Sequence, residues 1–112
     1  MKYTTRSEGK VYIFELKGKV MGGPESAAFH EDLKKAVGDG QRKVILDLGE
    51  VEWMNSSGLG LLISEHCTMR NAGGKLKLAR VTDKIESLLV INKLNSIFEV
   101  HPDVNAAITS LK

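Results

Sequence analysis

Ser56 and Ser57 are the side chains best placed for chemistry, because they lie in a segment, NSSGLGLL, that is typical of the start of a helix. Asn and Ser are favoured N-cap residues, so either Asn55 or Ser56 is expected to cap this helix. Ser57 then lies in the first turn, near unpaired backbone N–H groups and the positive end of the helix dipole, where a phosphate is tolerated. The segment therefore predicts a hydroxyl that can carry a phosphate while the helix beneath it stays folded. A capped helix start with no further role would explain the same residues.

Two glycines, Gly58 and Gly60, follow the serines inside an otherwise good helix sequence. Each costs a helix about 0.5–1 kcal/mol relative to alanine, and a close approach by another backbone would explain both. The segment also follows the carboxyl end of the strand-like sequence VILDL, where open α/β sheets bind ligands and partners. A partner packed against residues 58–60 would meet a desolvated, unpaired dianion if Ser57 were phosphorylated. Such a contact is unfavourable enough to abolish a specific interface.

The scaffold for this segment is predicted from the β-rich runs and helical spacings along the chain. Strands are expected at residues 3–7, 11–16, 43–48, 75–81 and 97–100. Helices are expected to begin at Pro24, at Asn55–Ser56, at Thr82–Asp83 and at Asp103. Residues 49–55 are expected to form a loop that Trp53 and Met54 anchor on the core. The order predicts the α/β class, with a mixed sheet of about five strands, about four helices and right-handed crossovers after an opening hairpin.

The composition is that of one domain, expected to span residues 1–112. The formal net charge of +2 is too even to indicate direct binding of nucleic acid or of an anionic membrane. No window approaches the roughly 20 apolar residues that a membrane span needs. The lone cysteine, Cys67, can form no internal disulfide and lacks a second thiol for a metal site. We therefore expect a cytoplasmic protein.

An enzyme is disfavoured by the residues around the serines. A serine hydrolase needs a pattern such as Gly-x-Ser-x-Gly, yet Met54 and Asn55 precede the serines, and His30, His66 and His101 are the only histidines. The glycines match neither a dinucleotide-binding loop nor a phosphate-binding P-loop. We expect no catalytic residue, no metal and no cofactor.

The strand VILDL, the short connection and NSSGLGLL, followed by a basic strand, together resemble the STAS domain of bacterial anti-sigma factor antagonists. The family pattern at the serines is Asp-Ser-Ser-Gly-Leu-Gly or Asp-Thr-Ser-Gly-Leu-Gly. The resemblance extends over nearly the whole chain, including residues 16–18 and 94–98. Two positions depart from the pattern: Asn55 stands in place of the usual aspartate, and Met21 stands where related chains commonly have aspartate.

The resemblance implies a regulatory protein whose switch is Ser57. In that family, a partner that is both anti-sigma factor and serine kinase phosphorylates this serine, and a PP2C-type phosphatase removes the phosphate. The unphosphorylated antagonist binds the anti-sigma factor and so releases the sigma factor. By this resemblance the partner-binding residues are Met21, Gly22, Gly23, Asn55, Ser56, Gly58, Leu59 and Gly60. The domain is then a monomer or weak dimer without direct nucleic-acid contact or a membrane span.

A second role within the same fold stays open. STAS domains also act as unphosphorylated scaffolds of signalling complexes and as regulatory subunits of membrane transporters. In that role Ser57 would be a contact residue only.

Overall fold

The chain begins with a β-hairpin. In the computed structural model, which describes residues 1–112, β1 (Lys2–Glu8) pairs antiparallel with β2 (Val11–Val20) across a tight turn. Gly9 takes a positive φ of 61° in this turn, a conformation that glycine adopts without steric cost. The predicted opening hairpin is therefore confirmed.

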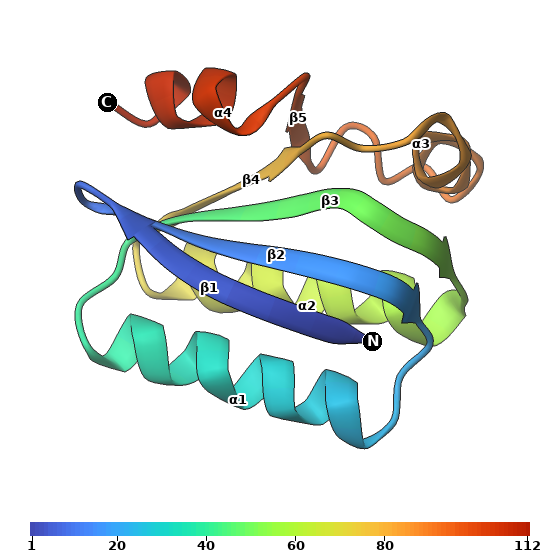
Figure 1. Cartoon of the computed structure of the whole chain (residues 1–112), viewed down its shortest axis with the longest axis horizontal. Helices are drawn as coiled ribbons and strands as arrows, with labels where there is room; N and C mark the ends of the chain where they lie inside the picture. The colour runs from blue at the N-terminus through green and yellow to red at the C-terminus, as the bar shows by residue number, and fades with distance from the viewer.

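Three parallel strands and four helices complete the fold (Figure 1). The later strands are β3 (Lys43–Met54), β4 (Lys75–Ala79) and β5 (Glu99–His101), and the sheet order is β1-β2-β3-β4-β5. The helices are α1 (Pro24–Gly38), α2 (Ser56–Asn71), α3 (Asp83–Ile91) and α4 (Val104–Ser110). The mixed five-stranded sheet with four helices confirms the predicted class and element order. None of these helices is both long and apolar enough to cross a bilayer.

The core has two parts because alternate residues of a strand point to opposite faces of the sheet. The larger part includes the residues that pack α1 and α2 against the sheet, and these two helices run side by side beneath it in Figure 1; it also includes Ile85 and Leu89 of α3. The smaller part lies under α4 on the other face and consists of Val11, Ile13, Ile45, Ala79, Ala107 and Leu111. Within β3, Val44 and Leu46 belong to the first part and Ile45 to the second. This strand is covered on both faces, as its apolar run predicted.

The predicted loop at residues 49–55 is wrong, because β3 continues to Met54. Strand β2 also runs further than predicted, to Val20, and the two strands pair in parallel along this added length. The register shifts twice there, between Glu15 and Lys17 and between Gly18 and Lys19. Backbone pairing between two irregular strands leaves little periodic signal in the sequence. As a result β3 leads into α2 through a single residue, Asn55.

Two strand ends also differ from the prediction. Strand β4 ends at Ala79, since Arg80 takes a positive φ of 54°. Strand β5 begins at Glu99 and not at Ile97, because the backbone N–H groups of Ile97 and Phe98 donate to the carbonyl of Leu94 in a turn. Both differences lie away from the serines.

Candidate functional site

Asn55 is the cap of α2 and joins two parts of the chain. Its backbone is extended, its Oδ1 accepts a hydrogen bond from the Gly58 N–H at 2.9 Å, and its Nδ2 donates to the Met21 carbonyl at 3.2 Å. The choice between Asn55 and Ser56 as the cap is thereby settled in favour of Asn55. The bond to Met21 requires an amide, since a carboxylate has no N–H to donate. Asparagine at position 55, in place of the family's aspartate, therefore links the end of β2 to the start of α2.

Gly58 allows the closest contact in this region. A Cβ placed on Gly58 would lie 2.0 Å from the carbonyl oxygen of Val20 and 3.3 Å from Cβ of Met54. The predicted approach of another backbone is confirmed here, and the approaching strand is β2. At Gly60 no other segment of this chain approaches, since a Cβ there would meet no atom within 4 Å, and close approach by a partner stays a prediction.

The loop between β2 and α1 lies against Ser57. Gly22 has a positive φ of 84°, and a Cβ on it would lie 3.0 Å from Cβ of Ser57 and 3.6 Å from its Oγ. Gly23 also has a positive φ, of 92°, but faces open space. Two segments that are far apart in the sequence thus form one surface at the carboxyl-terminal edge of β2 and β3.

The predicted site residues differ in how much of them reaches the surface. Ser56 and Ser57 are exposed, at the first and second positions of α2, so Ser57 lies in the first turn as predicted. Gly23 and Met21 are also exposed, the latter with 43% of its surface accessible. The half-buried members are Gly22, Asn55 and Gly60, and the buried members are Gly58 and Leu59. Leu59 packs in the larger core, so its side chain supports the site from below.

The electrostatics at Ser57 favour an anion. The first turn of α2 contains no acidic residue, and its N–H groups carry the positive end of the helix dipole. The start of α1 adjoins the same loop, and its N-cap residue, Gly23, has no side chain to cap the free N–H groups. Glu25 in the first turn of α1 pairs with the amino group of Met1 at 2.6 Å. The amino-terminal ends of α1 and α2 therefore both lie near the exposed hydroxyl of Ser57.

A groove runs between α1 and α2 from this point. It is lined by Ser26, Ala27, His30, Ser57, Gly60, Leu61 and Ser64. On its α1 wall, Nδ1 of His30 contacts Oε1 of Glu65, whose side chain is fully buried. Burial raises the pKa of Glu65 to about 7, while the contact with His30 acts in the opposite direction.

The pair of His30 and Glu65 was not predicted from the sequence. Glu65 lies three residues after Leu62 and four before Met69, on the buried stripe of α2. The sequence did contain a signal for this pair, since Glu65 is a carboxylate on an apolar stripe and a buried carboxylate needs a polar partner.

Trp53 also behaves differently from the prediction. Met54 is buried and anchors the end of β3, but Trp53 remains 36% exposed, with Nζ of Lys84 5.2 Å from its ring centre. Met21 and Trp53 are therefore exposed apolar side chains in the segments that lead to the serines.

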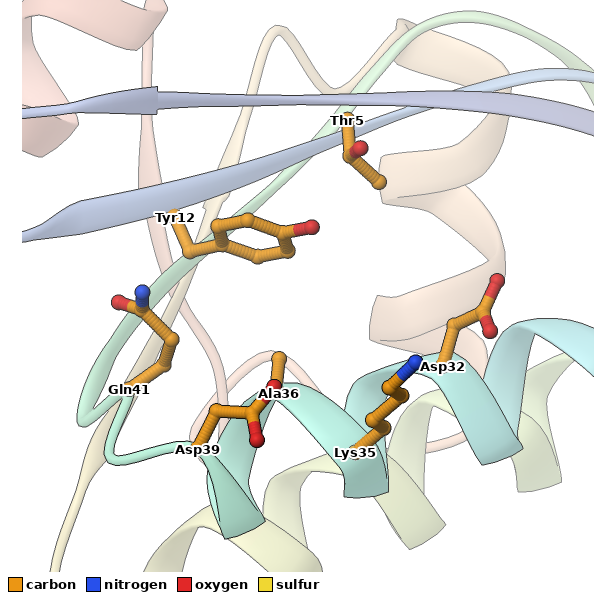
Figure 2. Close-up of a pocket in the computed structure, with 7 residues that line it drawn as sticks. All are labelled: Thr5, Tyr12, Asp32, Lys35, Ala36, Asp39 and Gln41. Carbon is orange, nitrogen blue, oxygen red and sulfur yellow. The ribbon is translucent and has the colours of Figure 1, made fainter.

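A second pocket lies toward the carboxyl end of α1, between that helix and the hairpin. Figure 2 shows its lining residues, which are Thr5, Tyr12, Asp32, Lys35, Ala36, Asp39 and Gln41. Asp32 also accepts a hydrogen bond from the Tyr3 hydroxyl, and burial, together with this bond, raises the pKa of Tyr3 to about 12. None of the residues predicted for the site lies in this pocket.

Comparison with known proteins places this arrangement in a family. Residues 2–107 match the STAS domain family. The chain is 28% identical over 112 residues to BtrV of Bordetella bronchiseptica, a protein named as an anti-sigma factor antagonist, covering 100% of this chain and 96% of BtrV. A crystal structure from Thermotoga maritima under the same functional name superposes with a TM-score of 0.88 at 19% identity, covering 97% of this chain and 93% of that one.

The phosphorylated form of the Bacillus cell fate determinant SpoIIAA has the same fold. It superposes with a TM-score of 0.77 at 14% identity, covering 99% of this chain and 100% of SpoIIAA. The sequence match, the shared fold and the serine at the capped start of α2 agree. This chain belongs to the STAS domain family and is similar over its full length to anti-sigma factor antagonists.

Proposed function

We propose that this chain is an anti-sigma factor antagonist whose partner binding is gated by phosphorylation of Ser57. The observation that carries the proposal is the placement of this hydroxyl, exposed in the first turn of α2 and in contact range of Gly22 from a second segment. The partner is an anti-sigma factor with serine kinase activity. A PP2C-type phosphatase would restore the binding form.

The gating follows from charge and solvation. A phosphoserine adds roughly −1.5 to −2 charges. The backbone N–H groups left free in the first turns of α1 and α2 tolerate this charge while the region is open to water. A partner that covers the region would desolvate the dianion, which costs several kcal/mol unless the partner supplies matching cations. The fold is therefore retained on phosphorylation while binding is lost.

The surroundings of Ser57 support a protein as the binding partner. Met21 presents apolar area next to Gly22, and the open space at Gly60 lets a partner approach α2 closely. Exposed methionine is enriched in protein interfaces. The family relationship and the phosphorylated form known for SpoIIAA add to this support.

The test compares variants of Ser57 with a matched variant of its neighbour. Ser57→Ala should fold and bind the anti-sigma factor constitutively, whereas Ser57→Asp should fold and bind at least tenfold more weakly, about 1.4 kcal/mol. Ser56→Ala is the control for the modification, since Ser56 is also exposed, is not the cap and is not the serine proposed to be phosphorylated. Intact mass after incubation with ATP and the candidate kinase should show one added phosphoryl group, mapped to Ser57.

Equal binding by both Ser57 variants would refute the gating. Co-purification with a membrane transporter or a large assembly, with Ser57 unmodified, would identify the chain as an unphosphorylated scaffold or regulatory subunit instead.

A further inference from the structure

The two edges of the sheet differ in how much backbone they leave unpaired. Strand β1 forms one edge and contributes seven residues, which pair with β2 without a register shift. Strand β5 forms the other edge but has only three residues, and it is followed directly by Pro102, which has no N–H group. Short strands and proline are common features that keep a sheet edge from pairing. Of the two edges, β1 is therefore the one suited to accept a further strand.

The outer side of β1 is accessible. All of its residues except Tyr3 are exposed, and no other segment of the chain pairs with that side of the strand. Helix α1 lies beneath the hairpin, but toward its carboxyl end a pocket separates it from Thr5, as Figure 2 shows. Because alternate residues of a strand direct their backbone groups to opposite sides, three or four of the seven residues of β1 present both N–H and C=O to solvent.

The charges of β1 complement those of a second copy of the same strand. In the antiparallel register that pairs Thr5 with Thr5 of the second copy, Lys2 lies opposite Glu8, and all seven residues overlap. Arg6 lies opposite the uncharged Thr4. Lys2 forms no ion pair within its own chain. Glu8 contacts Arg6 at 3.5 Å between Oε1 and Nε, and its side chain remains 49% exposed, so it is accessible to a second cation.

The neighbouring registers place like charges opposite each other. Since hydrogen-bonded and non-hydrogen-bonded pairs alternate along an antiparallel ladder, the partner strand can shift only in steps of two residues. One step in one direction puts Lys2 opposite Arg6, and one step in the other direction puts Arg6 opposite Arg6. Opposite charges directly across two strands stabilise the pair, and like charges destabilise it. The charge pattern therefore favours the register with Thr5 at the centre.

We propose that β1 pairs antiparallel with β1 of a second copy of this chain, about a two-fold axis at Thr5. The two five-stranded sheets then join into one sheet of ten strands. Both copies use the same patch, so the assembly closes as a dimer, and the short β5 edges do not extend it further. This inference goes beyond the proposed function and does not depend on it.

The dimer leaves the surface around Ser57 free. That surface lies at the carboxyl-terminal edge of β2 and β3, and the antiparallel pairing puts the two copies of it at opposite ends of the joined strands. Each dimer therefore presents two separate partner sites. One strand from each copy makes a small interface compared with the roughly 800 Å² per partner of stable complexes, so the dimer is weak and forms only at high protein concentration.

Sedimentation velocity of the full chain tests the association, at protein concentrations from about 10 μM to 1 mM, where small interfaces form. The mass should rise toward twice that of the monomer across this range. A protein that remains monomeric throughout would overturn the inference.

Charge exchange tests the register. Lys2→Glu places two carboxylates opposite each other at both ends of the interface and should weaken association by at least about fivefold. Glu8→Lys should have a similar effect, and the double variant Lys2→Glu/Glu8→Lys should restore the association of the parent. The matched control is Lys75→Glu, which makes the same change of charge at an exposed position on β4, three strands away, and should leave association unchanged. A double variant as weak as the single variants would overturn the proposed pairing.

Amide hydrogen exchange of the parent protein needs no variant and locates the interface directly. Amides of β1 that face solvent in the monomer should exchange more slowly at high than at low protein concentration, while those of β5 should not change. Slowing confined to elements other than β1 would overturn the inference even if the protein were a dimer. None of these measurements uses an anti-sigma factor or modifies Ser57, so a monomeric protein refutes only the dimer, and a failure of gating leaves the dimer intact.

Discussion

Alanine substitutions at Gly58 and Gly60 should change stability in opposite directions. The Cβ of Gly58→Ala would lie 2.0 Å from the Val20 carbonyl oxygen, so α2 must move away from β2. Overpacking of this kind costs about 1–3 kcal/mol. The movement also strains the cap bond from Gly58 to Asn55, and losing a cap costs about 1 kcal/mol. We expect Gly58→Ala to lower the free energy of unfolding by about 2–4 kcal/mol.

Gly60→Ala is the matched substitution two residues further along the same helix. Its Cβ would meet no atom within 4 Å, so only the helix propensity changes, and alanine gains about 0.5–1 kcal/mol. The two variants should therefore differ by roughly 2.5–5 kcal/mol, the sum of these estimates. In a domain of this size 1 kcal/mol corresponds to about 4–8 °C in Tm.

Urea denaturation measures the difference, with far-UV circular dichroism and the fluorescence of the single tryptophan, Trp53, as two independent probes. Coincident transitions would establish two-state unfolding, and an unchanged m-value would assign the effect to the folded state. A Gly58→Ala protein as stable as the parent would refute the account of why glycine is needed there. Binding of the anti-sigma factor by the stable Gly60→Ala protein then measures how closely the partner approaches α2.

Three further predictions follow from the described contacts. Gly22→Ala should destabilise by about 1–2 kcal/mol, because it combines a positive φ with a 3.0 Å contact to Ser57, and thermal melts check this value. Arg80→Ala should cost about 1–3 kcal/mol in urea denaturation, since it leaves the buried Asp47 carboxylate without its two bonds of 2.8 and 3.0 Å, although the guanidinium is partly exposed. The raised pKa of Glu65 means that its contribution to stability is fully present below about pH 4.5 and is lost as the pH rises to about 7. Stability should therefore fall across that range by roughly 1–3 kcal/mol more in the parent than in Glu65→Gln, and an equal decline in both proteins would contradict this assignment.

The class and the element order could be predicted because they depend on strong local signals. The apolar run of β3 and the cap residues Thr82 and Asp103 mark elements whose ends the sequence defines well. The extension of β3 to Met54 could not be predicted, since it depends on pairing with the added length of β2. Local propensity carries no information about a partner strand that is distant in sequence.

The same distinction applies to the candidate site. The position of Ser57 in the first turn was predictable from N-cap chemistry, which is local. The contact of Gly22 with Ser57 and the pair of His30 and Glu65 depend on how α1 is placed beside α2, and no spacing within one element encodes that placement. At Gly60 no contact within the chain explains the glycine. The space that it leaves open is the feature to test with a binding partner.

The bond from Asn55 to the Met21 carbonyl, together with the Gly58 contact, joins segments that are 34 residues apart in the chain. A docking protein therefore meets a surface that is already assembled, and little chain entropy is lost when the complex forms. Changes in affinity among variants of this surface should then appear mainly in the lifetime of the complex, with association rates nearly constant. Under the proposed gating, phosphorylation of Ser57 should therefore act mainly by shortening the lifetime of the complex.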